Sequence, residues 1–234
     1  MRFVLWNIRS GSDRKWPALT SMAPDVAVIC EAAQRPRAMT ATALGDPLLS
    51  WEWDGTNANK GLAIASWGHE LRRVDTTNAT GRWSIAARVE GVNVIGVWSC
   101  PLTSGAYAGE VGRALDAFAA PISSGAPVIV AGDFNVSGRH STFEPLRRRF
   151  AELGLVSAYH HVTGEPFGWE SARTWHARHD AERSSHIDFA FVSESLAGCI
   201  THLEVRDPST LTTAGLSDHS PIIVDFDLAR RECY

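Results

Sequence analysis

Polar side chains that can bind a metal ion or a phosphate follow an apolar run in the middle of this sequence. The small and β-branched residues 128–131 lead directly into Gly132, Asp133, Phe134 and Asn135. This pattern predicts a buried strand that ends in a tight turn, with a carboxylate and an amide at its C-terminal end. Alone it is a weak signal, because Asp and Asn also suit turns that have no chemical role.

Other apolar runs carry polar side chains at their ends in the same way. They are Asn7 after 3–6, Glu31 after 26–30, Asp188 near the start of 186–192, and Asp218 with His219 before 222–226. Carboxylate oxygens are the ligands that hard divalent cations prefer, and amides and an imidazole can bind a phosphate. Together these side chains indicate metal-assisted chemistry on a phosphate ester.

In chain order, the segments resemble the signatures of the endonuclease/exonuclease/phosphatase superfamily of metal-dependent phosphoesterases. The matching strings are Trp6-Asn7, Glu31, the GDFN of 132–135, the HID of 186–188 and the SDHSP of 217–221. Each string is short, but five in the right order from Asn7 to Pro221 are specific. The chain looks most like small exonuclease-III-like members. The resemblance implies an α+β fold, a four-layer αββα sandwich of two stacked mixed or antiparallel sheets flanked by helices.

The resemblance also implies a metal site and a phosphate site. By position in the motifs, Glu31 and Asn7 would hold Mg²⁺ or Mn²⁺, and Asp218 would help from the other half of the chain. Asn7 and Asn135 would contact the phosphate, and Asp133 would orient or deprotonate the attacking water.

Two further residues complete the catalytic set that the resemblance implies. His219 would contact a phosphate oxygen, and Asp188 would hold it and keep it protonated, because a carboxylate partner raises the pKa of an imidazole. A histidine that simply satisfies a turn is the alternative for His219.

The sequence departs from the family pattern at two places. Many relatives carry an acid or amide two residues after the first Asn, where this chain has Arg9. A metal-ligand role there is therefore in doubt, and a phosphate contact becomes conceivable. Relatives also place a Tyr or His after the strand that corresponds to 94–98, and Tyr107 is the candidate for that group here.

Histidine and arginine are frequent in the segment 160–186. Zinc usually takes Cys or a helical His pair, and the spacing of His160, His161, His176, His179 and His186 matches no such site. We expect instead that part of this segment lines the substrate groove, with a solvated loop as the alternative. The candidates are Arg178 and His179, then His176 and Arg183, with Lys60 from the other half.

Strands must bring these side chains to a common edge. Strand patterns cover 3–6, 26–31, 48–53, 60–67, 83–89, 92–98, 128–131, 174–175, 186–192, 200–205 and 222–228. Helical patterns cover 13–22, 38–44, 109–119 and a segment from Ser141 or Thr142 to Gly154. Residues 54–57 suggest a turn, and Glu90-Gly91 a two-residue hairpin. Hairpins favour mixed or antiparallel sheets. No linker divides the chain, so residues 1–234 are expected to form one catalytic domain.

Composition sets ordinary limits. The 234 residues are 44% hydrophobic and 21% charged, as in soluble globular proteins. A net charge of −4 argues against tight, non-specific coating of DNA but allows a local basic groove. Arg147, Arg148 and Arg149 are interpreted as the solvated face of a helix, with a nucleic-acid patch as the alternative.

Cysteine and tryptophan give further expectations. Cys30, Cys100, Cys199 and Cys233 form no CxxC pair, so buried free thiols are expected rather than disulfides or zinc ligands. Trp169 and Trp175 lie in a polar stretch, where either a substrate-facing platform or plain packing is possible, and we favour packing. No signal peptide or membrane span is evident, which predicts a cytoplasmic protein without a membrane partner.

The resemblance implies hydrolysis of a phosphodiester, with DNA or RNA as the expected partner and substrate. The alternative is a phosphatase or phosphodiesterase of a small molecule or lipid head group. Binuclear metallophosphatases need GDxH and GNH[DE] strings, which do not occur. A silent scaffold is disfavoured, because Glu31, Asp133, Asp188 and His219 are all present. No obligate protein partner is evident.

Overall fold

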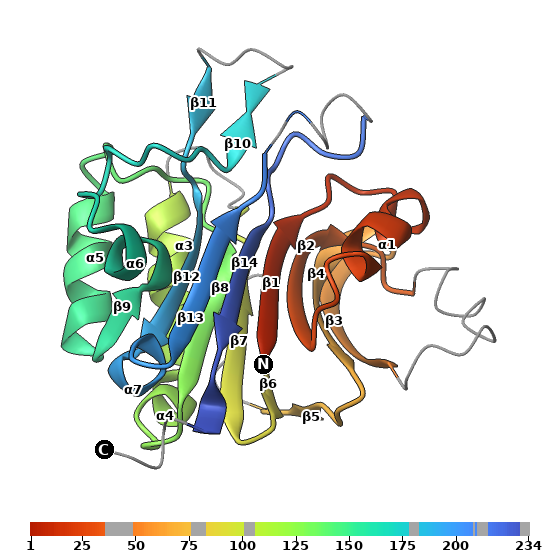
Figure 1. The fold of residues 1–234 in the computed structure, drawn as a ribbon, viewed down its shortest axis with the longest axis horizontal. Helices are drawn as coiled ribbons and strands as arrows, with labels where there is room; N and C mark the ends of the chain where they lie inside the picture. Colours follow the sequence, from red (N-terminus) through yellow and green to blue (C-terminus); the bar gives the residue numbers. More distant parts are fainter. Residues whose placement is uncertain are drawn as a thin grey trace.

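The computed structural model of the chain describes residues 1–35, 49–75, 83–100, 106–177, 183–207, 209 and 215–229. The predicted helix 38–44, Arg178, His179 and Cys233 lie outside these residues. Figure 1 shows two β-sheets that run side by side, with α1 at one flank and α3, α5 and α6 at the other.

The first sheet has six strands in the order β13-β14-β1-β2-β4-β3. In chain order they are β1 (Arg2–Asn7), β2 (Val26–Ala32), β3 (Leu49–Asn57), β4 (Lys60–Trp67), β13 (Ile200–Val205) and β14 (Ile222–Phe226). β1 and β2 are parallel, and the other neighbours are antiparallel.

The second sheet also has six strands, in the order β5-β6-β7-β8-β12-β9. They are β5 (Arg72–Arg73), β6 (Ser84–Val89), β7 (Val92–Val97), β8 (Val128–Asp133), β9 (Leu155–Ser157) and β12 (Asp188–Ser193). β7 and β8 are parallel and the other pairs are antiparallel. Each sheet is therefore mixed, as the hairpins predicted.

The remaining elements are helices and a short hairpin. The helices are α1 (Ser12–Thr20), α3 (Tyr107–Ala117), α4 (Ala119–Ile122), α5 (Phe143–Glu152), α6 (Ala158–Thr163) and α7 (Glu194–Ala197). The strands β10 (Trp175–His176) and β11 (Ser184–Ser185) pair with each other and rise above the sheets in Figure 1.

Apolar side chains fill three layers of core. Leu5 and Ile129 belong to the cluster between the two sheets. Trp16 of α1 packs on the outer face of the first sheet, and Phe150 of α5 packs on the outer face of the second. The order helix, sheet, sheet, helix confirms the predicted four-layer αββα sandwich.

One local prediction is wrong. The turn expected at 54–57 does not form there, because β3 continues to Asn57 and Asn57 pairs with Lys60. Gly55 serves packing instead: a Cβ on it would lie 2.4 Å from the ring of Trp53, and one on Gly61 would lie 2.5 Å from the same ring. The two glycines make room for this indole.

Other local predictions are confirmed. Val89 pairs with Val92 across the turn, and the positive φ angles of Glu90 (49°) and Gly91 (77°) suit a two-residue hairpin. Cys30 and Cys199 are buried free thiols as predicted, whereas Cys100 is only partly buried.

None of the helices within the described residues is long and apolar enough to cross a membrane.

The arginine run on α5 is explained by ion pairs on a solvated face. Arg147 and Arg148 both pair with Glu144, and Arg149 pairs with Asp116. These pairs support the interpretation as a solvated helix face.

Candidate active site

Alternation along three strands points polar side chains into one end of the space between the sheets. The residues at alternate positions along the same strands, such as Leu5, Ile129 and Ala190, belong to the core between the sheets. Because side chains alternate across a strand, Asn7, Asp133 and Asp188 continue this inward-facing series. Asp133 and Asp188 are also direct partners across β8 and β12. The site therefore lies at the upper end of the sheets in Figure 1.

Glu31 reaches the site through a β-bulge. Cys30 pairs with Leu62 and Ala32 pairs with Gly61, which leaves Glu31 as the extra residue of β2. Its φ of +58° is left-handed. A bulge re-aims the side chain of the extra residue. The side-chain amide of Asn7 donates to Glu31 Oε1 at 3.4 Å.

Asp133 is the centre of a hydrogen-bond network. Its Oδ1 accepts the backbone N–H of Asn135 at 2.9 Å. Its Oδ2 accepts the side-chain amides of Asn7 at 2.9 Å and Asn135 at 3.0 Å. The Asn135 amide also donates to the carbonyl of Ser99 at 2.9 Å. Both amides are thus oriented before any ligand binds.

The Asp133 carboxyl titrates near neutrality in spite of these donors. Burial is the main cause and the charge of Asp188 adds to it, and together they raise the pKa of Asp133 to about 7. A carboxyl with this pKa can accept a proton from water at physiological pH.

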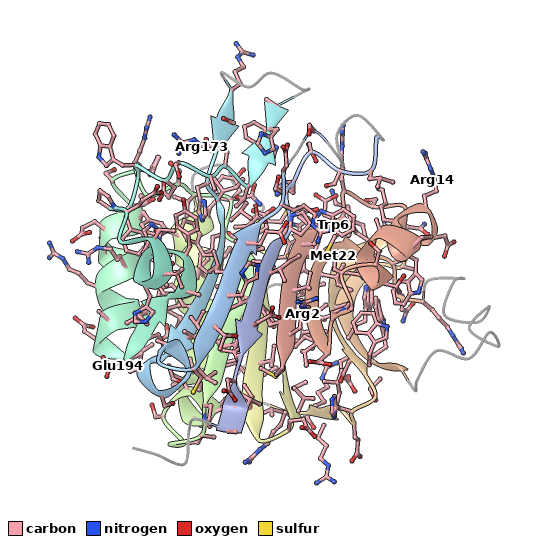
Figure 2. All side chains as sticks on the ribbon, viewed as in Figure 1. Arg2, Trp6, Arg14, Met22, Arg173 and Glu194 are labelled. Carbon is pink, nitrogen blue, oxygen red and sulfur yellow. The ribbon has the colours of Figure 1, made fainter. Side chains whose placement is uncertain are left out.

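His219 and Asp188 form a buried pair, with Nδ1 and Oδ2 2.9 Å apart. Burial alone lowers the pKa of His219, but the charge and the hydrogen bond of Asp188 outweigh it and raise the pKa to about 9. The imidazole is therefore cationic at neutral pH. Trp6, near the upper end of β1, donates its indole N–H to the His219 carbonyl at 2.9 Å (Figure 2).

The donor set fits a hard cation. Asp188 Oδ1 is buried, and no donor among the described residues contacts it. Ligand atoms of Asp133, Asp188 and His219 lie within 4.8 Å of one another, but a cationic His219 is not a metal ligand, so the carboxylates are the relevant members of this group. A buried carboxylate oxygen without a donor requires a water, a cation or a substrate proton. The neighbouring Glu31 and Asn7 add further oxygen atoms of the kind that Mg²⁺ and Mn²⁺ prefer.

Basic side chains accompany the carboxylates predicted to bind metal. Lys60 Nζ lies 3.1 Å from Glu31 Oε2 and 5.1 Å from the centre of the Trp98 ring. Arg9 Nε lies 3.8 Å from Asp218 Oδ1. The structure thus places Lys60 and Arg9 at the site and gives Asp218 a basic partner.

The loop that follows Asn7 is unusual in its backbone. Arg9, Ser10 and Gly11 have consecutive left-handed φ angles of 50°, 58° and 65°. The Arg9 N–H donates to Asn7 Oδ1 at 2.9 Å, and Ser10 Oγ donates to Glu31 Oε2 at 3.4 Å. Left-handed non-glycine residues are strained, so other contacts must hold this conformation.

Lys15 of α1 supplies those contacts. Its Nζ donates to the carbonyls of Ile8 at 2.7 Å and Arg9 at 3.2 Å, and to that of Ser10. The side chain is buried, and burial lowers its pKa. Lys15 was not among the predicted site residues, although its position four residues before Leu19 on the apolar face of α1 was a signal.

Two hydroxyl groups that were assigned no role also hold the site. Thr174 Oγ1 accepts the backbone N–H of Asp188 at 3.0 Å. Ser217 Oγ donates to the carbonyl of Asn7 at 2.7 Å and accepts the N–H of His219 at 3.1 Å. Ser217 lies inside the motif 217–221, whereas nothing in the sequence marks Thr174.

A pocket of about 360 Å³ opens next to Asn135. Its walls come from the loop after β8, the β10–β11 hairpin and the start of α3, and its lining residues include Asn135, Ser137, His140, Trp175, Ile187 and Tyr107. Tyr107 and the phosphate-binding candidate Asn135 therefore line the same pocket.

His176, a candidate for the substrate groove, is buried instead: it is only 8% exposed and its Nε2 contacts Ser220. His186 is also buried, against Tyr159. Arg183 is exposed at the end of the β10–β11 hairpin.

Comparisons with known proteins agree with this geometry. The model of the endonuclease/exonuclease/phosphatase family matches residues 4–219. A search of curated proteins finds no match.

Solved structures with the same fold cover nearly the whole chain. The 3′ phosphatase NExo from Neisseria, bound to a product DNA hairpin, has a TM-score of 0.74 at 22% identity over 97% of this chain and 99% of that one. An AP endonuclease from Archaeoglobus fulgidus has a TM-score of 0.77 at 18% identity over 97% and 100%. The endonuclease domain of the retrotransposon TRAS1 has a TM-score of 0.65 at 15% identity over 97% and 98%.

Proposed function

The chain belongs to the endonuclease/exonuclease/phosphatase family, and we propose that it is a Mg²⁺- or Mn²⁺-dependent hydrolase of phosphodiester bonds in DNA or RNA. The observation that carries the proposal is the convergence of carboxylate, amide and imidazole groups from both sheets on one buried network. It is built from Asn7, Glu31, Asp133, Asn135, Asp188 and His219.

Each group has a role in attack of water on phosphorus. Asp133, with a pKa of about 7, orients the water and accepts its proton. His219, kept cationic by Asp188, donates to a phosphoryl oxygen. Asn7 and Asn135 would donate amide hydrogens to the same phosphate in place of their present hydrogen bonds to Asp133. Tyr107 lies at the wall of the adjoining pocket.

Glu31 and Asn7 are the proposed metal-binding residues, with Asp218 in support. A bound divalent cation would neutralise charge on the phosphoryl oxygens and assist the leaving oxygen. Arg9 takes the place of a further acid. We assign it to the substrate phosphate, since it is a cation that contacts Asp218 rather than an oxygen ligand.

Nucleic acid is the favoured substrate for two reasons. The pocket of about 360 Å³ is of a size that binds small ligands, and Trp175 and Ile187 offer it apolar walls for a nucleoside. Two proteins of the same fold are a 3′ phosphatase bound to a DNA hairpin and an AP endonuclease.

The test is one panel of substrates with Mg²⁺ and with Mn²⁺. It contains single-stranded DNA, duplex DNA with and without an abasic site, RNA, phosphomonoesters and a lipid head-group phosphodiester. His219→Ala is run beside the wild type. We expect cleavage of a nucleic acid that falls by about 10²–10⁴ in the variant, the range for loss of a proton-donating group.

Other outcomes redirect the assignment. Hydrolysis of only the small esters would make the protein a small-molecule phosphatase or phosphodiesterase. Cleavage that survives both His219→Ala and removal of metal by chelation would contradict the proposed site.

A further inference from the structure

An exposed tryptophan stands on the loop that joins α6 to β10. Trp169 leaves 72% of its surface exposed, more than any other large apolar side chain among the described residues. The prediction that it packs is therefore wrong. A single exposed apolar side chain is ordinary on a protein surface. The surroundings of Trp169 are what distinguish it.

A cation lies against this indole. The guanidinium carbon of Arg139 is 5.3 Å from the centre of the Trp169 ring, within the range of a cation–π contact. In the part of the chain that the structure describes, no carboxylate forms an ion pair with Arg139. The nearby Arg147 also lies over a ring, that of Phe167, but its charge is neutralised by Glu144. The positive charge of Arg139 is therefore not neutralised by any described carboxylate and can attract an anionic ligand.

Two glycines fix the tryptophan loop to the loop that leaves the active site. A Cβ on Gly138 would lie 2.5 Å from the backbone nitrogen of Gly168. A Cβ on Gly168 would lie 2.9 Å from Arg139 Cγ, and φ there is +85°. Larger residues would force the two loops apart. The Arg139 Nε also donates to the Gly168 carbonyl.

The loop is anchored from within as well. The buried carboxylate of Glu170 accepts the Gly168 N–H at 2.8 Å and lies 3.3 Å from His160 Nε2. The backbone N–H of Trp169 donates to the Pro166 carbonyl at 3.0 Å. The indole is therefore presented by an ordered loop, so that a ligand would not have to order it on binding.

The loop that follows β8 connects this surface to the active-site pocket. Arg139 follows Asn135 by four residues, a segment that spans at most about 14 Å. Its neighbours Ser137 and His140 line the pocket. Arg173, which pairs with Glu170, lies on the same side of the molecule, beside the β10–β11 hairpin (Figure 2).

We propose that Trp169 and Arg139 form a platform that stacks an unpaired base of a single-stranded nucleic acid, next to the nucleotide held in the pocket. The inference rests on the proposed function and specifies its substrate as a single strand or a frayed end. An indole stacks on the face of any base, and a guanidinium without a carboxylate partner attracts the phosphate backbone. In a duplex, neighbouring pairs already cover both faces of each base.

The test measures binding by fluorescence anisotropy without a divalent metal. Two labelled ligands of equal length and charge are compared, an oligothymidylate and the same backbone without bases. Trp169→Ala should lower the preference for the base-bearing strand by about 5- to 100-fold relative to wild type, the range for one stacked base. Trp169→Phe should retain part of the preference. Arg139→Gln should weaken binding of both strands.

Two controls match these changes. Val162→Ala removes another exposed large apolar side chain of the described residues, at 46% exposure on α6. Arg72→Gln removes an exposed cation on β5, at the opposite end of the sheets (Figure 1). Neither should change the preference for bases.

Measuring cleavage of nucleic acid by the wild type distinguishes a failure of the platform from a failure of the proposed function. If the wild type cleaves nucleic acid and Trp169→Ala keeps the full preference for bases, the platform is wrong and the proposed function stands. If the wild type neither cleaves nor binds nucleic acid, both are wrong. Turnover of the smallest phosphoester should be unchanged in Trp169→Ala, and a loss there would also overturn the platform.

Discussion

Two buried groups of the site, Asp133 and His219, titrate on either side of pH 8. The pKa of Asp133 is raised to about 7 and that of His219 to about 9. A base that must be ionised and an acid that must be protonated give a bell-shaped pH profile. We therefore expect kcat/KM to rise through about pH 7 and to fall through about pH 9.

The first prediction concerns the partner of the imidazole. Asp188→Asn removes the charge that raises the pKa of His219, so His219 becomes neutral at a lower pH. Turnover at pH 8 should fall by about 10²–10⁴. The alkaline limb of the pH profile should also move to lower pH, which kcat/KM measured from about pH 6 to 10 will show. An alkaline limb at the wild-type position would remove Asp188 from this role.

The free energy of unfolding should also depend on the protonation of His219. The folded-state pKa of His219 lies above its ordinary value of 6.5, so its stabilising contribution is complete below that pH and is lost as the pH rises through about 9. In urea unfolding, the decline in the free energy of unfolding over this window should be smaller in Asp188→Asn than in the wild type.

The second prediction concerns Lys15. Lys15→Met keeps the side-chain length but removes the donor for the carbonyls of Ile8, Arg9 and Ser10. The free energy of unfolding should fall by about 2–4 kcal/mol, because hydrogen bonds from a buried charged group are lost. Relaxation of the strained loop should also raise the dissociation constant for Mn²⁺ about tenfold, a coupling of about 1.4 kcal/mol.

Calorimetric titration of Mn²⁺ separates positioning from plain structure. Arg14→Met is the matched control, since Arg14 is the adjacent residue of α1 and is exposed (Figure 2). Arg14→Met should bind Mn²⁺ like the wild type. A Lys15→Met protein that is less stable but binds Mn²⁺ normally would show that Lys15 is only structural.

At the scale of elements, the polar residues at the ends of strands could be predicted from the sequence. Asn7, Asp133 and Asp188 follow from strict alternation along apolar strands, so their convergence was predictable once two sheets were expected. The bulge at Glu31 was not, because a bulge depends on pairing between strands and leaves no local signature. The prediction of a turn at 54–57 is wrong for a similar reason. Glycine is needed at position 55 because a side chain there would collide with the ring of Trp53, and not because the chain turns.

The third prediction concerns β8. A Cβ on Gly132 would lie 1.6 Å from the carbonyl oxygen of Val97 in the adjacent strand β7. Gly132→Ala must push β7 and β8 apart and should lower the free energy of unfolding by more than about 3 kcal/mol. Asp133 follows directly, so activity should fall with stability.

Urea unfolding checks this result against a glycine in open space. Nothing lies within 4 Å of a Cβ on Gly112 in α3, so Gly112→Ala should raise the free energy of unfolding by about 0.5–1 kcal/mol. Wild-type stability in Gly132→Ala would mean that the strands adjust without cost.

For the whole molecule, the site is a product of the two-sheet arrangement. The first sheet supplies Asn7 and Glu31, and the second supplies Asp133 and Asp188. The sandwich and the order of its motifs were predictable from the sequence. The Lys15 contacts and the exposure of Trp169 were not, because the first depend on the backbone path of residues 8–10 and the second on how the loop around Trp169 packs against the loop at Gly138.

The pairing of β1 with β14 has a consequence for synthesis of the protein. Arg2 pairs with Asp225, 223 positions later, and β14 lies beside β1 in Figure 1. During synthesis on the ribosome, β1 emerges early but cannot pair with β14 until the end of the chain is made. Pairing between strands so far apart in sequence is also slow to form. His219 arrives with the same late segment. A nascent chain therefore holds no working hydrolase until β14 is made, and a product truncated before β14 leaves an open strand edge that invites aggregation.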